Sequence, residues 1–300
     1  MSPLLCESDI LAALASYREH IGHLNHRALS AMVPAVQAAG LNDDEPGDDE
    51  PPTKARLDFI LRVVGAGDGG RDVRPPGIIT SPSDVLTHWA TLAPQLSLDG
   101  ASVYGDAAWR DEIRGRYVQG VLRGLNERCR SELVTTWEEF PADLAVVLRQ
   151  VDSLEGPGWH KWRYERESLV FLEGWVRDTS RQQTYDPYTE EEFAALVRTP
   201  EEIAQWTTEF AEEYEIAGGW QCSETGNEAT CYVVYSRART DAAAGEEERR
   251  GWSWRYVASL GQYGEQWFED MVGLLAWYKS YGEPREEDWS VTAEEVFSAC

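Results

Sequence analysis

The sequence has 300 residues, with 27 basic against 53 acidic side chains and a formal net charge of -26. Such a charge repels phosphate backbones and anionic lipid headgroups, which disfavours nucleic acids and membrane surfaces as direct ligands, whereas a basic protein would be attracted at long range. A hydrophobic fraction of 42% and an aromatic fraction of 11% are typical of a folded chain rather than a disordered one.

The N-terminus and the cysteines predict a cytoplasmic protein. Residues Met1–Ile10 lack a basic stretch followed by an apolar segment, and nowhere does a run of about 18 apolar residues occur, which disfavours secretion and a membrane span. The cysteines are Cys6, Cys129, Cys222, Cys231 and Cys300. An odd number of scattered cysteines fits reduced thiols better than a disulfide framework.

Apolar residues near the N-terminus recur at alternating steps of four and three, the spacing of one buried helical stripe. They are Ile10, Leu14, Tyr17, Ile21 and Leu24. We therefore expect residues 1–41 to form an amphipathic helix. Residues 42–56, which follow, combine turn formers with like charges and predict a flexible acidic linker.

Residues 57–136 are expected to form a second, mostly helical region. Residues 57–64 have the i, i+3, i+4, i+7 spacing of a short helix. Ser83 can cap a helix that continues to Trp89, and residues 109–133 predict a longer helix despite three internal glycines.

The composition changes near Trp137, because eleven of the 13 tryptophans lie from that residue onward. The patterns in this half predict strands at Leu169–Val176, Trp220–Ser223, Cys231–Ser236 and Trp252–Leu260, and helices at Pro200–Tyr214 and Glu265–Tyr281. We therefore expect one domain over residues 137–285, followed by a C-terminal tail at 286–300. The expected fold class is α+β, an antiparallel sheet flanked by helices and preceded by a mostly helical N-terminal region.

One hairpin is predicted in detail. With Gly226-Asn227 as a two-residue turn, the register pairs Cys222 with Cys231 across the two strands. Counted from the turn, the two cysteines form a non-hydrogen-bonded pair, in which Cα atoms approach to about 4.5 Å. In a reducing cell, we expect the two cysteines to remain a cross-strand thiol pair that is packed in the sheet.

A glycine-rich stretch at residues 65–70 matches the spacing G-x-G-x-x-G of nucleotide-binding loops. The segment before it has helical rather than strand periodicity, and Pro75-Pro76 follows shortly afterwards, so a loop is the expected structure. The sequence contains no nucleophile elbow, P-loop, H-E-x-x-H or paired C-x-x-C motif. No cofactor is expected.

His20, His23 and His26 recur at the spacing of one helical turn, which can bring imidazoles to a shared zinc ion. Helical geometry places all three at the edge of the apolar stripe or beyond it, so they are expected to face solvent and no metal site is predicted. The many adjacent glutamates are interpreted as solvated helix faces, because acid–base catalysis needs carboxyl groups in unlike environments.

Phe140-Pro141-Ala142-Asp143-Leu144 opens a predicted helix that is followed by the turn residues 152–158 and Trp159. Together with the later strands and the closing helix, this order resembles the SUKH superfamily over residues 137–281. The family includes the fungal cell-wall-synthesis regulator and many bacterial toxin-immunity proteins. The resemblance implies a non-enzymatic fold that holds a protein partner, as a regulatory scaffold or an immunity protein.

The leading hypothesis is therefore a protein-binding module whose partner is a protein, and the net charge of -26 favours a basic one. The loop after the Pro141 helix and the tryptophans that alternate onto one face of a strand are expected to supply the binding face. Its predicted residues are Asp152, Glu155, Trp159, Trp162, Trp252 and Trp254.

Two other classes stay open at this stage. A hydrolase-like enzyme would need a pocket that assembles distant residues such as Glu155, His160 and Cys231. A structural subunit of a permanent complex would need a large contiguous apolar patch. The oligomeric state does not follow from the sequence.

Overall fold

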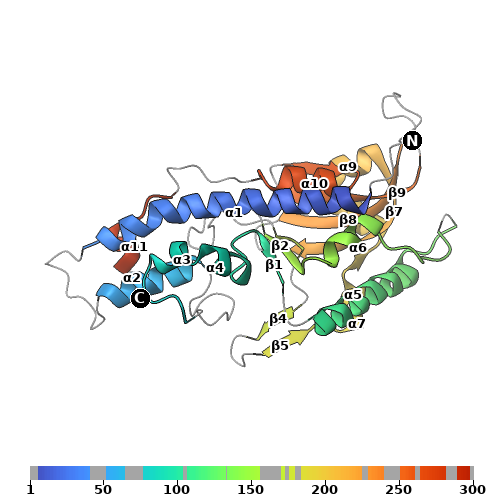
Figure 1. Cartoon of the computed structure of the whole chain (residues 1–300). Coiled ribbons are helices and arrows are strands. Elements are labelled where there is room, and N and C mark those ends of the chain that lie inside the picture. The colour runs from blue at the N-terminus through green and yellow to red at the C-terminus, as the bar shows by residue number, and fades with distance from the viewer. Residues whose placement is uncertain are drawn as a thin grey trace.

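In the computed structural model, a helical N-terminal region is followed by an antiparallel sheet packed with helices (Figure 1). The structure describes residues 6–40, 52–64, 77–103, 107–132, 134–155, 170–172, 176–179, 184–224, 229–239, 251–260, 264–281 and 289–297. The predicted α+β fold class is confirmed.

The elements of the described residues follow one another from helices to a mixture of strands and helices. The helices are α1 (Glu7–Ala38), α2 (Pro52–Val63), α3 (Asp84–Thr87), α4 (Trp89–Gln95), α5 (Ala107–Arg128), α6 (Ala142–Leu148), α7 (Glu190–Ala195), α8 (Pro200–Trp206), α9 (Thr208–Glu213), α10 (Met271–Tyr278) and α11 (Ala293–Phe297). The strands are β1 (Ala101–Ser102), β2 (Ser153–Glu155), β3 (Val170–Leu172), β4 (Val176–Thr179), β5 (Thr184–Pro187), β6 (Val197–Arg198), β7 (Tyr214–Glu224), β8 (Ala229–Ala238), β9 (Ser253–Leu260) and β10 (Glu265–Phe268).

The largest sheet among these residues has the strand order β10-β9-β8-β7-β6, with all neighbours antiparallel. Because alternate residues of a strand point to opposite faces, the sheet presents two sets of side chains. One face, with Trp220, Val233 and Tyr256, lies in a large core that also contains residues of α1, α5, α6 and α10. The other face packs against Ile203 of α8 and Phe210 of α9.

Helix α1 contributes to two hydrophobic cores. The five residues of its predicted stripe are buried, which confirms the helical spacing. Near the sheet, Tyr17 stacks on Tyr278 of α10 with ring centroids 5.6 Å apart, whereas residues from Ala28 to Val36 belong to a second core with α2, α3, α4 and α11. Figure 1 shows α1 reaching from α10 to α2 and α11. The division between the cores therefore does not fall at residue 137.

Two segment limits differ from the predicted ones. The last residues of the predicted linker, 52–56, begin α2, since a proline at the start of a helix loses no hydrogen bond; residues 42–51 lie outside the described part. Within the predicted tail, residues 293–297 form α11, and Val296 is fully buried beside α2 in the helical core. Apolar burial therefore anchors part of the segment that was expected to be a C-terminal tail.

Two predicted helices are also interrupted. Within the predicted helix 200–214, residues 200–213 form α8 and α9 with a break at Thr207, and Tyr214 already begins β7. In the predicted helix 265–281, the first residues form β10 instead, because they pair with β9, and α10 begins only after Asp270, whose side chain caps it. Pairing along a sheet edge here overrides the helical spacing of the apolar residues.

Helix α5 approaches α7 closely at two of its glycines. A Cβ atom on Gly124 would lie 2.6 Å from the backbone oxygen of Ala194, and one on Gly120 would lie 2.7 Å from the backbone oxygen of Glu190. Gly115, on the same helix, has nothing within 4 Å of its Cβ position. Gly120 and Gly124 thus permit the close packing of α5 on α7, whereas Gly115 takes no part in this packing.

We predict opposite effects for two glycine-to-alanine changes in α5. Gly124→Ala should lower the free energy of unfolding by about 1–3 kcal/mol, because the added methyl group meets backbone atoms. Gly115→Ala should raise it by up to about 1 kcal/mol through helix propensity alone. Urea unfolding curves of the two variants measure both effects, and a Gly124→Ala protein as stable as Gly115→Ala would contradict the packing described.

Candidate functional site

A cluster of partly exposed aromatic rings lies where β8 and β9 leave the large core. Trp254 faces Tyr235 in the strand register, and Trp252, which directly precedes β9, lies beside the same tyrosine. The rings of Tyr235 and Trp252 are stacked with centroids 5.7 Å apart, and those of Tyr235 and Trp254 are tilted at 5.0 Å. We call Tyr235, Trp252 and Trp254 the aromatic layer.

The aromatic layer continues the core outward to the surface. Trp254 contacts two buried indoles, Trp137 at 5.7 Å and Trp220 at 5.2 Å between ring centroids. Trp252, Trp254 and Tyr235 are themselves only half-buried. The buried rings hold the layer in place, while the layer keeps part of its own surface open to solvent.

A fixed cation lies against one end of the layer. The guanidinium carbon of Arg237 lies 4.9 Å from the centre of the Trp252 ring. The Nε and Nη2 atoms of Arg237 approach the Oε2 atom of Glu215 at 2.7 and 2.6 Å, so the neighbouring strand β7 holds the guanidinium in position. This contact is a cation–π interaction supported by an ion pair.

The negative charge of a nearby glutamate acts on Tyr235. Burial raises the pKa of Tyr235, and the negative charge of Glu139 raises this pKa further. Glu138 and Glu139 are both exposed on the segment that carries Trp137. The layer thus combines flat apolar rings with an unburied negative charge.

The structure separates the residues of the predicted binding face. Trp252 and Trp254 come together as predicted from their alternation, whereas Asp152 lies elsewhere, buried beside α5. Its Oδ1 atom accepts a hydrogen bond from Nη2 of Arg114 at 3.1 Å, and its backbone N–H donates to Ser102. Glu155 is the last residue of β2. Trp159 and Trp162 lie outside the described residues, as does His160 of the enzyme hypothesis.

Sequence reasoning missed Tyr235, Arg237 and Trp137 as members of this site. Tyr235 and Arg237 alternate along β8 as the tryptophans do along β9, so extending the strand register could have placed the two rows side by side. Trp137 comes from a loop, and no periodic pattern indicates where a loop residue packs.

The predicted pairing of Cys222 with Cys231 is wrong by one residue. Ser223 stands opposite Cys231, because a β-bulge inserts Cys222 as an extra residue after Gln221. Beyond the bulge, the predicted register holds, with Gln221 opposite Tyr232. Both cysteines are buried in the large core as thiols that form no disulfide, and burial raises the pKa of Cys231 to about 12.

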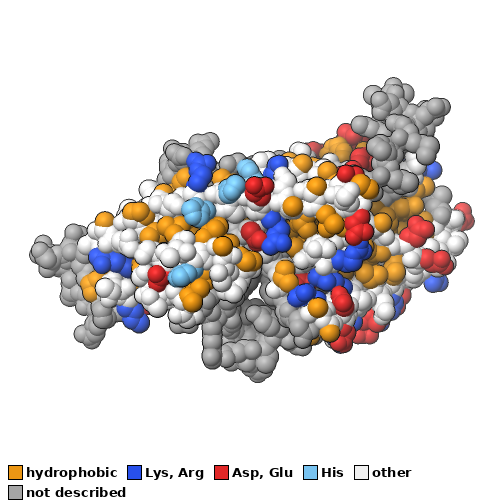
Figure 2. Space-filling view, in the orientation of Figure 1, with side chains coloured by type: hydrophobic (Ala, Val, Ile, Leu, Met, Phe, Trp, Pro, Cys, Tyr) orange, Lys and Arg blue, Asp and Glu red, His pale blue; other side chains and the backbone are white. Residues whose placement is uncertain are grey.

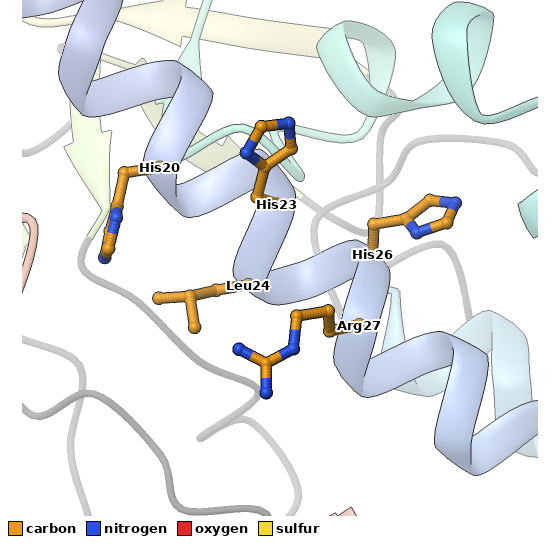
Figure 3. A pocket seen from close by; sticks show the side chains of 5 residues that line it. All are labelled: His20, His23, Leu24, His26 and Arg27. Atoms are coloured by element: carbon orange, nitrogen blue, oxygen red, sulfur yellow. The ribbon is translucent and has the colours of Figure 1, made fainter.

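A second candidate is a hollow on α1, with a volume of about 420 Å³, lined by His20, His23, Leu24, His26 and Arg27. Figure 3 shows that the histidines point in different directions around the helix, and Figure 2 shows histidines over α1 and α4, away from most acidic side chains. His23 is exposed as expected, whereas His20 and His26 are only partly exposed. The described part of the chain holds no group of three His, Cys, Asp or Glu side chains that could bind a metal ion.

Neighbouring helices already use the hollow for packing. The ring of His26 meets the edge of Trp89 at 5.0 Å, and its Nδ1 atom lies 3.5 Å from the hydroxyl of Ser30. The guanidinium of Arg27 lies 5.3 Å from the centre of the Trp289 ring. The aromatic layer is therefore the stronger candidate for a functional site.

Comparisons with known proteins give no relative: no family model, curated protein or solved structure matches this chain. The resemblance to the SUKH superfamily thus has no support beyond the residues that suggested it. No helix of the described residues is long and apolar enough to span a lipid bilayer.

We predict that Asp152→Asn acts on stability. Removal of the carboxylate charge leaves Arg114, whose side chain is 12% exposed, without its buried counter-ion, and should cost about 3 kcal/mol of unfolding free energy. The matched control is Glu112→Gln on the same helix, where the pair with Arg116 is exposed and the expected cost is below about 0.5 kcal/mol. Chemical unfolding of both variants tests the difference, and equal stability would contradict a structural role for Asp152.

The raised pKa of Cys231 predicts a thiol that does not react in the folded protein. A pH of 8 lies well below the Cys231 pKa of about 12, so the Cys231 thiol is protonated and lacks the reactive thiolate form. Iodoacetamide should label the exposed Cys6 and leave Cys231 unlabelled, and guanidinium unfolding should make both react. Peptide mapping by mass spectrometry decides, since labelling of Cys231 at the rate of Cys6 would show an accessible thiolate.

Proposed function

We propose that this protein is a non-enzymatic binding module that holds a basic protein partner on the aromatic layer. The carrying observation is the stacked pair Tyr235–Trp252, which stays half-exposed on a rigid sheet. Tryptophan and tyrosine are the side chains that most often dominate the energy of protein interfaces, because they bury a large area with little loss of conformational entropy.

The charge of the chain indicates the sign of the partner. A net charge of -26 attracts a basic protein at long range, and the exposed Glu138 and Glu139 place negative charge beside the layer itself. The same charge disfavours nucleic acid and anionic lipid as direct ligands. Steered association of this kind weakens as salt concentration rises.

The buried thiol supports binding over catalysis. The enzyme hypothesis names Cys231 as one candidate pocket residue, but burial in the large core raises its pKa to about 12 and leaves a protonated, inaccessible thiol at neutral pH. A role as a regulatory scaffold or an immunity-type protein in the cytoplasm, as the SUKH resemblance implies, belongs to the same proposal.

The test is affinity capture from a lysate of the source organism, with quantitative mass spectrometry, at low and at raised salt. Wild-type protein should retain a basic protein that is lost at raised salt, and Trp252→Ala should reduce its recovery at least about tenfold, as for a central interface residue. The matched control is Trp206→Ala, since Trp206 is 59% exposed on α8 and outside the layer.

Recovery that is equal for wild type and Trp252→Ala, with circular dichroism confirming that both are folded, would overturn the aromatic layer as the binding surface. Loss with Trp206→Ala alone would place the interface on α8 instead.

A further inference from the structure

We infer that the aromatic layer selects arginine side chains, so that the segment of the partner seated on it is an arginine-bearing one. This inference rests on the proposed function and specifies its ligand chemistry. The layer contains an internal example, because the guanidinium of Arg237 already lies over the Trp252 ring at 4.9 Å.

The internal example shows what the layer offers to a guanidinium. Arg237 meets a flat indole on its plane and a carboxylate, Glu215, on its nitrogen atoms at 2.6–2.7 Å. The guanidinium is planar and weakly hydrated, so it can stack on a ring and donate hydrogen bonds in the ring plane at the same time.

Tyr235 and Trp254, the other two rings of the layer, carry no arginine of the described residues over their planes. Tyr235 and Trp254 are half-buried and tilted at 5.0 Å from each other. The charge of Glu139 acts on Tyr235, as the raised pKa of its phenol shows. Two partly exposed rings and an exposed carboxylate whose charge reaches Tyr235 therefore offer the same kinds of group that hold Arg237.

Lysine does not match this surface as well. Its ammonium group is a compact, strongly hydrated charge that gains from a carboxylate but loses hydration when it lies on a ring. Long-range attraction to a chain of charge -26 is the same for both residues. A preference for arginine over lysine would therefore show recognition by the rings of the layer, whereas equal binding of both would show attraction by the net charge alone.

The experiment compares two eight-residue peptides, one alternating glycine with arginine and the other glycine with lysine, each with a fluorescent label. Fluorescence anisotropy at about 0.15 M salt should give binding to the wild-type protein about five- to tenfold tighter for the arginine peptide, as one desolvated cation–π contact allows. Trp254→Ala should reduce this ratio to about one in a protein that circular dichroism shows to be folded, and Trp254→Phe should keep part of it, because a ring is retained.

Two charge variants separate the local carboxylate from the net charge. Glu139→Gln should weaken binding of the arginine peptide about threefold more than Glu212→Gln, which removes an equal charge from the exposed surface of α9. Trp206→Ala should leave the ratio between the peptides unchanged.

Equal binding of the two peptides by the wild type, or a ratio that survives Trp254→Ala, would overturn the inference. If the partner capture described above still depends on Trp252 in that case, the proposed function stands and the layer accepts an apolar segment instead. If capture does not depend on Trp252 and the peptide ratio does not depend on Trp254, both proposals fail together.

Discussion

One side of α1 is buried in two successive hydrophobic cores, and the packing of the other elements depends on this burial. Its first half packs against the helices and the sheet of the large core, and its second half packs against α2, α4 and α11. The helix backbone fixes the directions of all side chains on the apolar stripe relative to one another. Packing of the stripe in one core therefore also sets the direction in which the stripe faces the other core. The two cores are therefore oriented relative to each other by α1.

The same packing explains why the aromatic layer is half-exposed. Along β9, the side chains from Arg255 to Leu260 are buried, while Ser253 and Trp254 at the beginning of the strand are not. The sheet thus extends past the helices that cover it, and Trp137 and Trp220 support the rings from below. A rigid base with an open surface is the arrangement that keeps a binding site preorganised.

The sequence predicted features that repeat and missed features that depend on single contacts. Apolar spacing identified α1, and alternation placed Trp252 and Trp254 on one face, because both signals extend over several residues. The bulge at Cys222 shifts a register by one residue, and the ion pair of Arg114 with Asp152 joins positions far apart in the chain. Nothing in the local pattern distinguishes such an aspartate from an exposed one, and β10 shows that a neighbouring strand can override helical spacing.

The contact of α11 with α2 has a consequence for the order of events during synthesis. The helical core joins α1 and α2, which are translated before the sheet, to Trp289 and Val296, which are translated after it. Until then, the apolar side of α2 lacks part of its cover and is a target for chaperones that bind exposed hydrophobic segments. The packing of α1 and α2 is therefore completed only after the sheet has been translated, although both helices emerge before it.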